Sequence, residues 1–254
     1  MIVLRSTLFW IMASLLTIPY GFALAGLSLV PLKIRYAVVA GWRRSFMFLV
    51  RYVLGVRMVV RGLENVPDYP VIIFAKHQSA WETVALQEIF HPVVLVLKQE
   101  LLRIPFFGWG LASLKMISID RNSGKEALRQ IVTQGRERLG VGLNIIIFPE
   151  GTRVAPGEYR RYKPGAAYLA CKTGTQVLPL AHNAGEIWPR KALLVRSGTI
   201  TVSIGPLIDT AGKREAEINH LAETWIEGEM RQLSPRFYPD AAPEAASPDA
   251  APGR

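Results

Sequence analysis

A buried strand followed at once by a charged turn constrains the fold of this chain more than any other stretch. The run from Asn144 to Phe148 ends in four apolar residues, three of them β-branched, which is typical of a strand covered on both faces. Pro149 ends the strand, and residues 150–153 (Glu-Gly-Thr-Arg) follow. Because open α/β sheets bind ligands at the carboxyl ends of their strands, this turn is predicted to lie at a binding site.

The turn at residues 150–153 has the chemistry of an anion site. Gly151 lets the backbone approach a ligand with its N–H groups exposed, and Arg153 presents a planar guanidinium that fits a carboxylate or a phosphate. The alternative is an ordinary surface loop in which Glu150 and Arg153 pair with each other. The turn by itself leaves both interpretations open.

Further strand candidates share the apolar character of this run, and helical periodicity separates them. Strands are predicted at residues 71–74, 92–97, 115–119, 176–180 and 199–204, and helices at 125–139, 165–174 and 213–233. This alternation predicts an α/β domain over residues 61–238, with a mixed, largely parallel sheet flanked by helices. Residues 239–254 are mostly Pro, Ala, Asp and Glu, so we expect a disordered tail.

The first 60 residues are predicted to form an N-terminal membrane-embedded helical segment. The chain carries a net charge of +10, and no Asp or Glu precedes Glu64. Residues 6–32 are uncharged, a run longer than the roughly 20 residues that a helix needs to cross a bilayer. Pro19 and Gly21 either kink one spanning helix or turn two half-length helices back to the same side. The basic residues that follow predict a cytoplasmic position for the rest of the chain.

Other interpretations of this region stay open. The apolar run and the small residues at 23–25 resemble a secretory signal that would be cleaved near Gly26. Residues 42–55 show an apolar stripe at helical spacing beside Arg44 and Arg51, which indicates either a basic amphipathic helix in the membrane interface or a core helix with solvated charges. Nucleic acid is a weaker explanation of the positive charge, because no nucleic-acid-binding motif accompanies it.

A histidine and a carboxylate follow the strand predicted at residues 71–74. His77 lies in the strand-to-helix turn, and Glu82 lies in the first turn of the next helix. A carboxylate that holds an imidazole fixes its tautomer and stabilises the imidazolium formed when a hydroxyl loses its proton. The pattern therefore predicts His77 as a general base oriented by Glu82. Alternatively, Ser79 and Glu82 form only a capping box, and His77 is an ordinary loop histidine.

Neither a protein nucleophile nor a metal site accompanies His77 in the sequence. The single cysteine, Cys171, falls in an apolar helical run, and no Gly-x-Ser-x-Gly motif occurs. The residues around His77 lack metal-ligand spacing. If His77 acts as a base, the expected nucleophile is a hydroxyl group of the substrate.

Four blocks in order resemble the glycerolipid acyltransferases, most nearly the 1-acyl-sn-glycerol-3-phosphate acyltransferase (PlsC) type. They are His77 with its acid, the Ile-Asp-Arg at 119–121, the Phe-Pro-Glu-Gly-Thr-Arg at 148–153 and the Val-Leu-Pro at 177–179. The resemblance covers roughly residues 60–210. It implies transfer of an acyl group from acyl-CoA or acyl carrier protein to the sn-2 hydroxyl of lysophosphatidic acid, giving phosphatidic acid in phospholipid biosynthesis. It implies no cofactor besides this co-substrate.

The resemblance also assigns roles to residues. His77 would be the base and Glu82 its orienting carboxylate, although the first block of the family usually ends in aspartate, so the reach of the acid differs here. The expected substrate-binding residues are Arg121, Glu150, Gly151, Thr152, Arg153, Lys163 and Pro179. The expected location is the cytoplasmic face of the bacterial inner membrane, with the phospholipid bilayer as a partner.

Alternatives remain for the substrate and for the activity itself. The same fold would serve an acyltransferase for glycerol-3-phosphate, another lysophospholipid or a lyso-ornithine lipid. A non-catalytic membrane lipid-binding protein is the alternative outside the enzymes. The basic residues Arg160, Arg161 and Lys163 either extend the phosphate site, receive the phosphates of the donor or form a solvated charge run.

Overall fold

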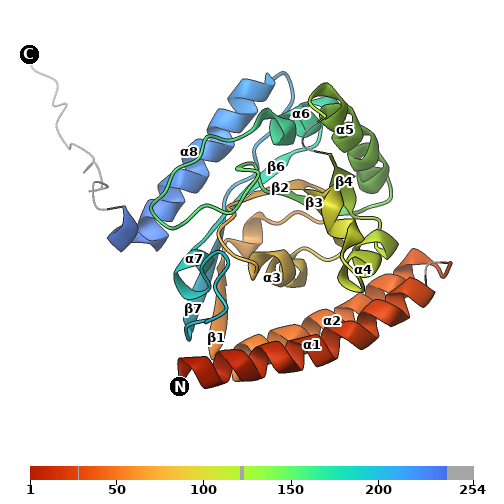
Figure 1. Cartoon of the computed structure of the whole chain (residues 1–254). Helices are drawn as coiled ribbons and strands as arrows, with labels where there is room; N and C mark the ends of the chain where they lie inside the picture. Colours follow the sequence, from red (N-terminus) through yellow and green to blue (C-terminus); the bar gives the residue numbers. More distant parts are fainter. Residues whose placement is uncertain (28, 121–122, 239–254) are drawn as a thin grey trace, which may run out of the picture.

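A twisted sheet with helices on both faces forms the body of the protein, and a helical hairpin lies along one side (Figure 1). The computed structural model describes residues 1–27, 29–120 and 123–238. Within these ranges seven strands form one sheet in the order β1-β7-β6-β2-β5-β3-β4. The strands are β1 (Val56–Arg61), β2 (Ile72–Ala75), β3 (Val93–Lys98), β4 (Ile117–Ile119), β5 (Asn144–Ile147), β6 (Val177–His182) and β7 (Gly198–Ile204).

The strand directions confirm the predicted fold class. In the described part of the chain, neighbouring strands run parallel except for the antiparallel pair β6 and β7. Parallel strands need crossover connections, and helices supply most of them here. The helices are α1 (Ile2–Gly26), α2 (Leu32–Tyr52), α3 (Glu82–Ile89), α4 (Phe107–Ser113), α5 (Lys125–Gly140), α6 (Pro164–Thr173), α7 (Ala184–Ile187) and α8 (Glu215–Leu233).

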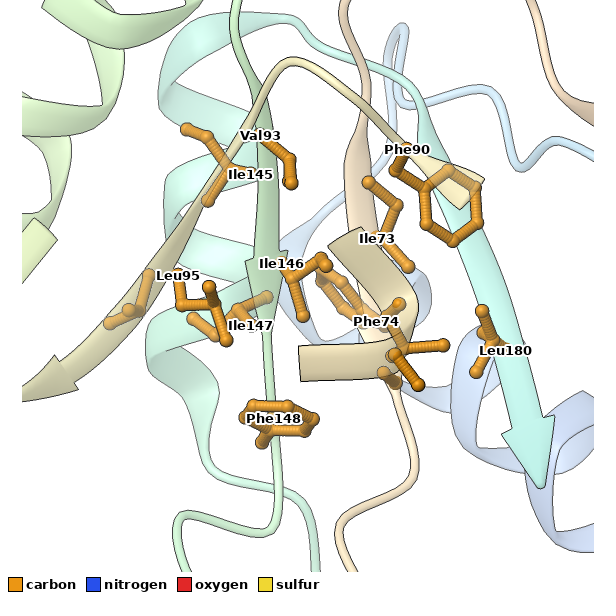
Figure 2. Packing of buried hydrophobic residues seen from close by; sticks show 14 of the residues in the cluster. Ile73, Phe74, Phe90, Val93, Leu95, Ile145, Ile146, Ile147, Phe148 and Leu180 are labelled. Carbon is orange, nitrogen blue, oxygen red and sulfur yellow. The ribbon is translucent and has the colours of Figure 1, made fainter. Parts of the chain in front are cut away.

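The helices divide between the two faces of the sheet. Helices α5, α6 and α8 contact one another or the strands on one face, and α3 lies on the other face, against α2 (Figure 1). The central strands are therefore covered on both sides, as the continuous apolar runs predicted. Ile72, Ile73 and Phe74 of β2 are 0% exposed. Figure 2 shows Ile73 and Phe74 packed with the side chains of β5 and Leu180.

The carboxyl ends of adjacent strands place the polar turns side by side. Phe74 of β2 pairs with Ile147 of β5, so the turns that begin at residues 76 and 148 leave the sheet together. On the other side of β2, Ala75 pairs with Leu180 of β6. The order β6-β2-β5-β3 therefore brings four strand ends to one edge, where an open α/β sheet binds its ligands.

The N-terminal hairpin differs in detail from its prediction. Helix α1 continues through Pro19, and the break between the two helices falls between Gly26 and Leu32. Because Pro19 lies inside α1, the chain does not turn back at Pro19, and of the two alternatives the kink in one helix stays a prediction. Among the described helices, α1 meets the length and hydropathy of a membrane span, with a mean hydropathy of 1.7. Its exposed apolar side chains, Leu4 and Leu15 among them, face away from the protein.

Helix α2 has one side in the core, as one of the two interpretations of residues 42–55 expected. One side is part of the core, where Val50 is 0% exposed, and Arg43 is buried in an ion pair with Glu88 of α3. The opposite side is solvent-exposed and carries Arg51 and Phe48. Packing on the body thus explains part of the apolar stripe, and contact of the exposed side with lipid headgroups stays a prediction.

The sheet begins earlier than the predicted domain. Strand β1 was not predicted, and it pairs in parallel with β7 from the other end of the chain. The boundary predicted between residues 60 and 61 therefore falls inside β1. The predicted disordered tail at 239–254 lies outside the described residues.

Candidate active site

The imidazole of His77 is held at the carboxyl end of β2. Its Nδ1 lies 2.9 Å from Oε1 of Glu82, and its ring stacks on Phe148 with the ring centroids 4.1 Å apart. A carboxylate only accepts hydrogen bonds, so Nδ1 carries the proton and donates it. This leaves Nε2 as the ring nitrogen available to a substrate hydroxyl. His77 therefore has the tautomer and the support that a general base needs.

Glu82 is a fully buried carboxylate at the start of α3. Its Oε1 also accepts the backbone N–H groups of Gln78 at 2.9 Å and Ser79 at 2.8 Å. Burial opposes the charge, but the hydrogen bond from His77 and the N–H of Ser79 hold the pKa of Glu82 below its usual value. Glu82 is thus an anion in the neutral pH range, and the longer acid reaches the imidazole directly.

The predicted capping box forms only in part. Glu82 reaches back to the N–H of Ser79, but the Ser79 hydroxyl accepts the N–H of Trp81, and α3 begins at Glu82. Helix capping and the contact with His77 therefore use the same carboxylate oxygen, and the two interpretations of Glu82 do not exclude each other.

Two hydrogen bonds join the His77 turn to the turn after β5. The N–H of His77 donates to Oε2 of Glu150 at 2.7 Å, and the C=O of His77 accepts the N–H of Val154 at 2.8 Å. Residues on both sides of the 150–153 turn are thereby fixed to the catalytic candidate. Gly151 has a φ of +71°, a left-handed conformation that glycine adopts without strain.

Glu150 belongs to a buried ion cluster beneath these turns. Lys76 Nζ lies 2.7 Å from Oε1 of Glu150 and 2.7 Å from Oε1 of Glu227 on α8. Lys76 and Glu150 are 0% exposed. Burial raises the pKa of Glu150 to about 7, and the neighbouring Lys76 ammonium offsets this rise only in part. Glu150 thus pairs with Lys76 and not with Arg153, and it is absent from the cavity lining, so its contact with substrate stays a prediction.

His182, at the end of β6, fixes the other side of Lys76. Its Nε2 lies 2.8 Å from the C=O of Lys76, and its Nδ1 accepts the N–H of Ala184 at 3.2 Å. Both ring nitrogens are thus used in the neutral form, and burial lowers the pKa of His182. His182 supports the backbone next to His77 and has no free nitrogen for catalysis.

A cavity of about 430 Å³ opens beside His77. At one end it is lined by His77, Gly151, Thr152 and Arg153, together with cationic residues of neighbouring segments. The remainder is mostly apolar and comes from the N-terminal hairpin, α3 and the β3–α4 region, where its lining includes Leu24, Val39, Leu95, Leu97, Leu111 and Met116. One cavity thus joins a base, an anion site and an apolar channel.

The other predicted binding residues occupy different places. Pro179 is buried within β6, paired with Phe74, and does not line the cavity, so its role at the substrate stays a prediction. Lys163 lies across Gly151, and a Cβ at Gly151 would stand 3.2 Å from Lys163 Nζ. Lys163 is nevertheless absent from the cavity lining, which includes Gly151. Arg121 lies outside the described residues.

Three cations of the cavity were not predicted from the sequence. Lys98 is the last residue of β3, and Arg190 and Lys191 follow α7. Arg190 Nη1 donates to the C=O of Arg153 at 3.2 Å. A lysine directly after a predicted strand was a usable signal for Lys98, because that strand ends at the same edge as β2 and β5. Arg190 and Lys191 follow no strand end, and nothing in the sequence pattern marked them.

The described residues contain no group of three or more His, Cys, Asp or Glu side chains that could hold a metal ion. Cys171 lies in α6, partly buried, with its Sγ 3.9 Å from the C=O of Lys213. It is absent from the cavity lining. The polar side chains that line the cavity with His77 include Thr83, Gln87 and Thr152 as well as its cations.

Comparisons with known proteins point to one family. The sequence model of the family described as Acyltransferase matches residues 57–183. The 1-acyl-sn-glycerol-3-phosphate acyltransferase of Pseudomonas aeruginosa is 44% identical over 239 residues, covering 91% of this chain and 92% of that protein. A protein of the same name from Borreliella burgdorferi is 32% identical over 173 residues, covering 67% of this chain and 69% of that protein.

A solved structure has the same fold. The crystal structure of the 1-acyl-sn-glycerophosphate acyltransferase PlsC from Thermotoga maritima matches with a TM-score of 0.77 at 25% sequence identity. The match covers 91% of this chain and 95% of that one. The match therefore spans most of the length of both chains.

Proposed function

The chain belongs to the acyltransferase family, and from that premise we propose that it transfers an acyl group to the sn-2 hydroxyl of 1-acyl-sn-glycerol-3-phosphate, giving phosphatidic acid. The observation that carries the proposal is the single cavity that joins His77, Arg153 and an apolar channel. An acceptor with a hydroxyl, a phosphate and an acyl chain fits all three parts. The donor is a thioester, acyl-CoA or acyl-ACP, and no further cofactor takes part.

The proposed chemistry is one proton transfer coupled to one acyl transfer. Nε2 of His77 takes the proton of the acceptor hydroxyl as its oxygen attacks the thioester carbonyl. The new C–O bond forms, the C–S bond breaks, and the imidazolium returns the proton to the leaving thiolate. Glu82 stabilises the imidazolium through Nδ1, since its carboxylate lies 2.9 Å away.

Arg153 is the proposed centre of the phosphate site. It lies two residues from Gly151 on the turn that is fixed to His77, and it lines the same cavity. Lys98, Arg190 and Lys191 add positive charge to that lining. A phosphate there would make charge-assisted hydrogen bonds with a guanidinium and nearby amides. The acyl chain of the acceptor would then lie along the apolar part of the cavity.

The N-terminal hairpin is the proposed membrane attachment. The contacts of α1 with the body occur near both of its ends, at Trp10, which bonds to Leu193, and at Phe22, whose ring packs on Phe106. A helix held along the body in this way lies beside the sheet and not across the full bilayer, so its exposed apolar side enters one leaflet. We assign the cytoplasmic face of a bacterial inner membrane, where both thioester donors occur.

Replacing Arg153 by alanine should weaken acceptor binding. Loss of one charge-assisted hydrogen bond to phosphate costs about 1.5–3 kcal/mol, which corresponds to a KM for the lysophosphatidic acid acceptor raised roughly 10- to 100-fold. Initial rates at varied acceptor concentration measure this, with Arg129→Ala as the control, since the Arg129 side chain is 81% exposed on α5. An unchanged acceptor KM in the Arg153 variant would place the phosphate elsewhere.

Changing the acid at position 82 separates charge from reach. Glu82→Gln removes the anion that fixes the His77 tautomer, so kcat should fall roughly 10- to 100-fold, the equivalent of one hydrogen bond to a charged group. Glu82→Asp keeps the charge and should lose less, with a larger remaining kcat than the glutamine variant. Steady-state kcat for both, with unfolding temperatures as the folding control, measures the difference. Equal and mild losses would leave Glu82 with helix capping alone.

A panel of acceptors tests the proposed substrate. Purified protein in membranes is assayed with lysophosphatidic acid, glycerol-3-phosphate, a neutral lysophospholipid and a lyso-ornithine lipid, each with acyl-CoA and with acyl-ACP. We expect the largest kcat/KM with lysophosphatidic acid. A larger value with an acceptor that lacks phosphate would contradict the proposal, because Arg153 and its neighbouring cations would then lack their partner.

A further inference from the structure

The loop between α7 and β7 carries exposed leucines beside basic side chains. In the 189–196 loop (Pro189 to Arg196), Leu193 is 71% exposed and Leu194 is 47% exposed. Three cations of the same loop are also exposed, namely Arg190, Lys191 and Arg196. Exposure of neighbouring large apolar side chains to water costs free energy. Such a patch marks a surface that contacts another molecule or a membrane.

The 189–196 loop is fixed against the N-terminal half of α1. The indole Nε1–H of Trp10 donates to the C=O of Leu193 at 2.8 Å, and the N–H of Val195 donates to the hydroxyl of Ser6 at 3.0 Å. Phe9 is 0% exposed and packs its ring edge-on to Trp188 at a centroid distance of 5.5 Å. The loop is therefore displayed in one position along the helix that is proposed to enter the bilayer.

Exposed apolar side chains of α1 lie in the same stretch of the helix as its contacts with this loop. Near Ser6 and Trp10, helix α1 exposes Leu4 at 71% and Ile11 at 54%. Since Leu193 is hydrogen-bonded to Trp10, the loop leucines adjoin this part of α1. In Figure 1 the chain between α7 and β7 lies on the side of the sheet near the amino-terminal end of α1. A lipid surface that contacts α1 there also meets the loop.

The basic end of the 189–196 loop reaches the active-site cavity. Arg190 and Lys191 line the cavity together with His77, and Arg190 bonds to the backbone of Arg153. One short segment thus connects the apolar helix surface to the anion site. Cations beside lipid-inserted leucines have the arrangement of an interfacial binding element, with the charges at the level of the headgroup phosphates.

We propose that the 189–196 loop is a second membrane-contact element, in which Leu193 and Leu194 enter the acyl region of the bilayer and Arg190 and Lys191 bind anionic lipid phosphates at the mouth of the cavity. This rests on the proposed function for the nature of the acceptor, whose phosphate would pass these cations on its way from the bilayer to Arg153. We assign an anionic lipid surface as the partner of the 189–196 loop, because the exposed charges of the loop are positive and the loop lies against α1.

A depth probe on the loop tests the insertion directly. Leu193→Cys, in a full-length chain that also carries Cys171→Ala, is labelled with an environment-sensitive fluorophore and reconstituted in phosphatidylcholine–phosphatidylglycerol vesicles containing brominated acyl chains. We expect quenching several-fold stronger than at Leu221→Cys, a control leucine 39% exposed on α8. Equal quenching at the two positions would overturn the proposal.

Kinetics with two forms of the acceptor test the consequence. The double variant Leu193→Ser, Leu194→Ser should raise the KM for acceptor presented in vesicles about tenfold, through lost burial of two leucines. The KM for a short-chain, monodisperse acceptor should stay at the wild-type value, and Leu221→Ser should alter neither. An equal rise for both acceptor forms, or none for the vesicle form, would contradict the proposal.

The two proposals fail in different ways. Turnover of lysophosphatidic acid by the labelled Leu193→Cys protein is measured on the samples used for quenching. Quenching without turnover, when the unlabelled wild type is also inactive, contradicts the proposed function and supports insertion of the loop. Turnover without quenching contradicts insertion of the 189–196 loop into the bilayer and leaves the proposed function supported.

Discussion

His77→Ala is expected to lower the rate of acyl transfer about 10²- to 10⁴-fold, the usual contribution of general-base catalysis. The variant keeps Glu82, Arg153 and the apolar channel, so the acceptor KM should change far less than kcat. The substitution also removes one ring stacked on Phe148 at the edge of the cavity, where the imidazole side chain is 15% exposed. Its effect on the unfolding temperature should therefore be modest.

The measurement is kcat with lysophosphatidic acid and a thioester donor in membranes. His220→Ala is the matched control, because His220 is exposed on α8 and is absent from the cavity lining. The control should keep the wild-type rate. If His77→Ala retained more than about a tenth of the wild-type kcat, the loss would be smaller than a general base contributes. His77 would then be removed from the mechanism.

The catalytic turn could be predicted from the sequence because its geometry is local. His77 and Glu82 lie five residues apart across one strand-to-helix turn, so spacing alone brings the two side chains within reach. The meeting of this turn with residues 150–153 depends instead on β2 and β5 being neighbours. Periodicity does not reveal strand order, and the resemblance of four ordered blocks supplied that part.

Roles that depend on burial could not be predicted in the same way. Glu150 stands in a Gly-containing turn, where exposure was the natural expectation, but the turn directs it inward. It is buried because Lys76, one residue before His77, points to the same interior and provides a counter-charge. The partner on α8, Glu227, is distant in sequence and carries no motif. Pro179 was likewise assigned to the pocket from its block, whereas the strand pairing of β6 buries it.

Strand β1 was missed because its signals are weak and its partner is remote. Arg57 and Arg61 interrupt its apolar residues, and they were read together with the basic cluster after the apolar segment. Its pairing with β7 joins residues about 140 positions apart, for example Met58 with Ile200. Such a contact is fixed by the tertiary fold, since β propensity depends on the neighbours that a strand meets.

The buried ion cluster beneath the catalytic turn carries the largest stability prediction. Lys76→Met removes the one ammonium between Glu150 and Glu227 and leaves a buried carboxylate without a counter-ion. Breaking a buried pair in this way costs about 3–5 kcal/mol, and at this chain length the unfolding temperature should fall by roughly 6–20 °C. Burial opposes the charge on Lys76, but the two carboxylates hold its pKa above the usual value, so the ammonium is present throughout the neutral range.

The pH dependence of this loss has a definite sign. Burial already raises the pKa of Glu150 to about 7, above its value in an unfolded chain, so folding favours the protonated acid. Stability from such a group is complete at low pH and is lost as pH rises through the folded pKa. Removing the ammonium raises the pKa of Glu150 further. The deficit of Lys76→Met relative to wild type should therefore grow as pH rises above 7.

Glu227→Gln is the matched control for Lys76→Met. It leaves one ammonium with one carboxylate, a neutral pair, and Glu227 is itself 14% exposed, so the loss should be about 1 kcal/mol or less. Thermal unfolding of the three proteins in the same detergent, at pH values on either side of 7, measures both effects. Equal losses in the two variants would mean that Lys76 is held by its packing, because only the methionine variant strands a buried charge. A deficit that does not grow as pH rises above 7 would contradict a pKa of Glu150 raised beyond that value in Lys76→Met.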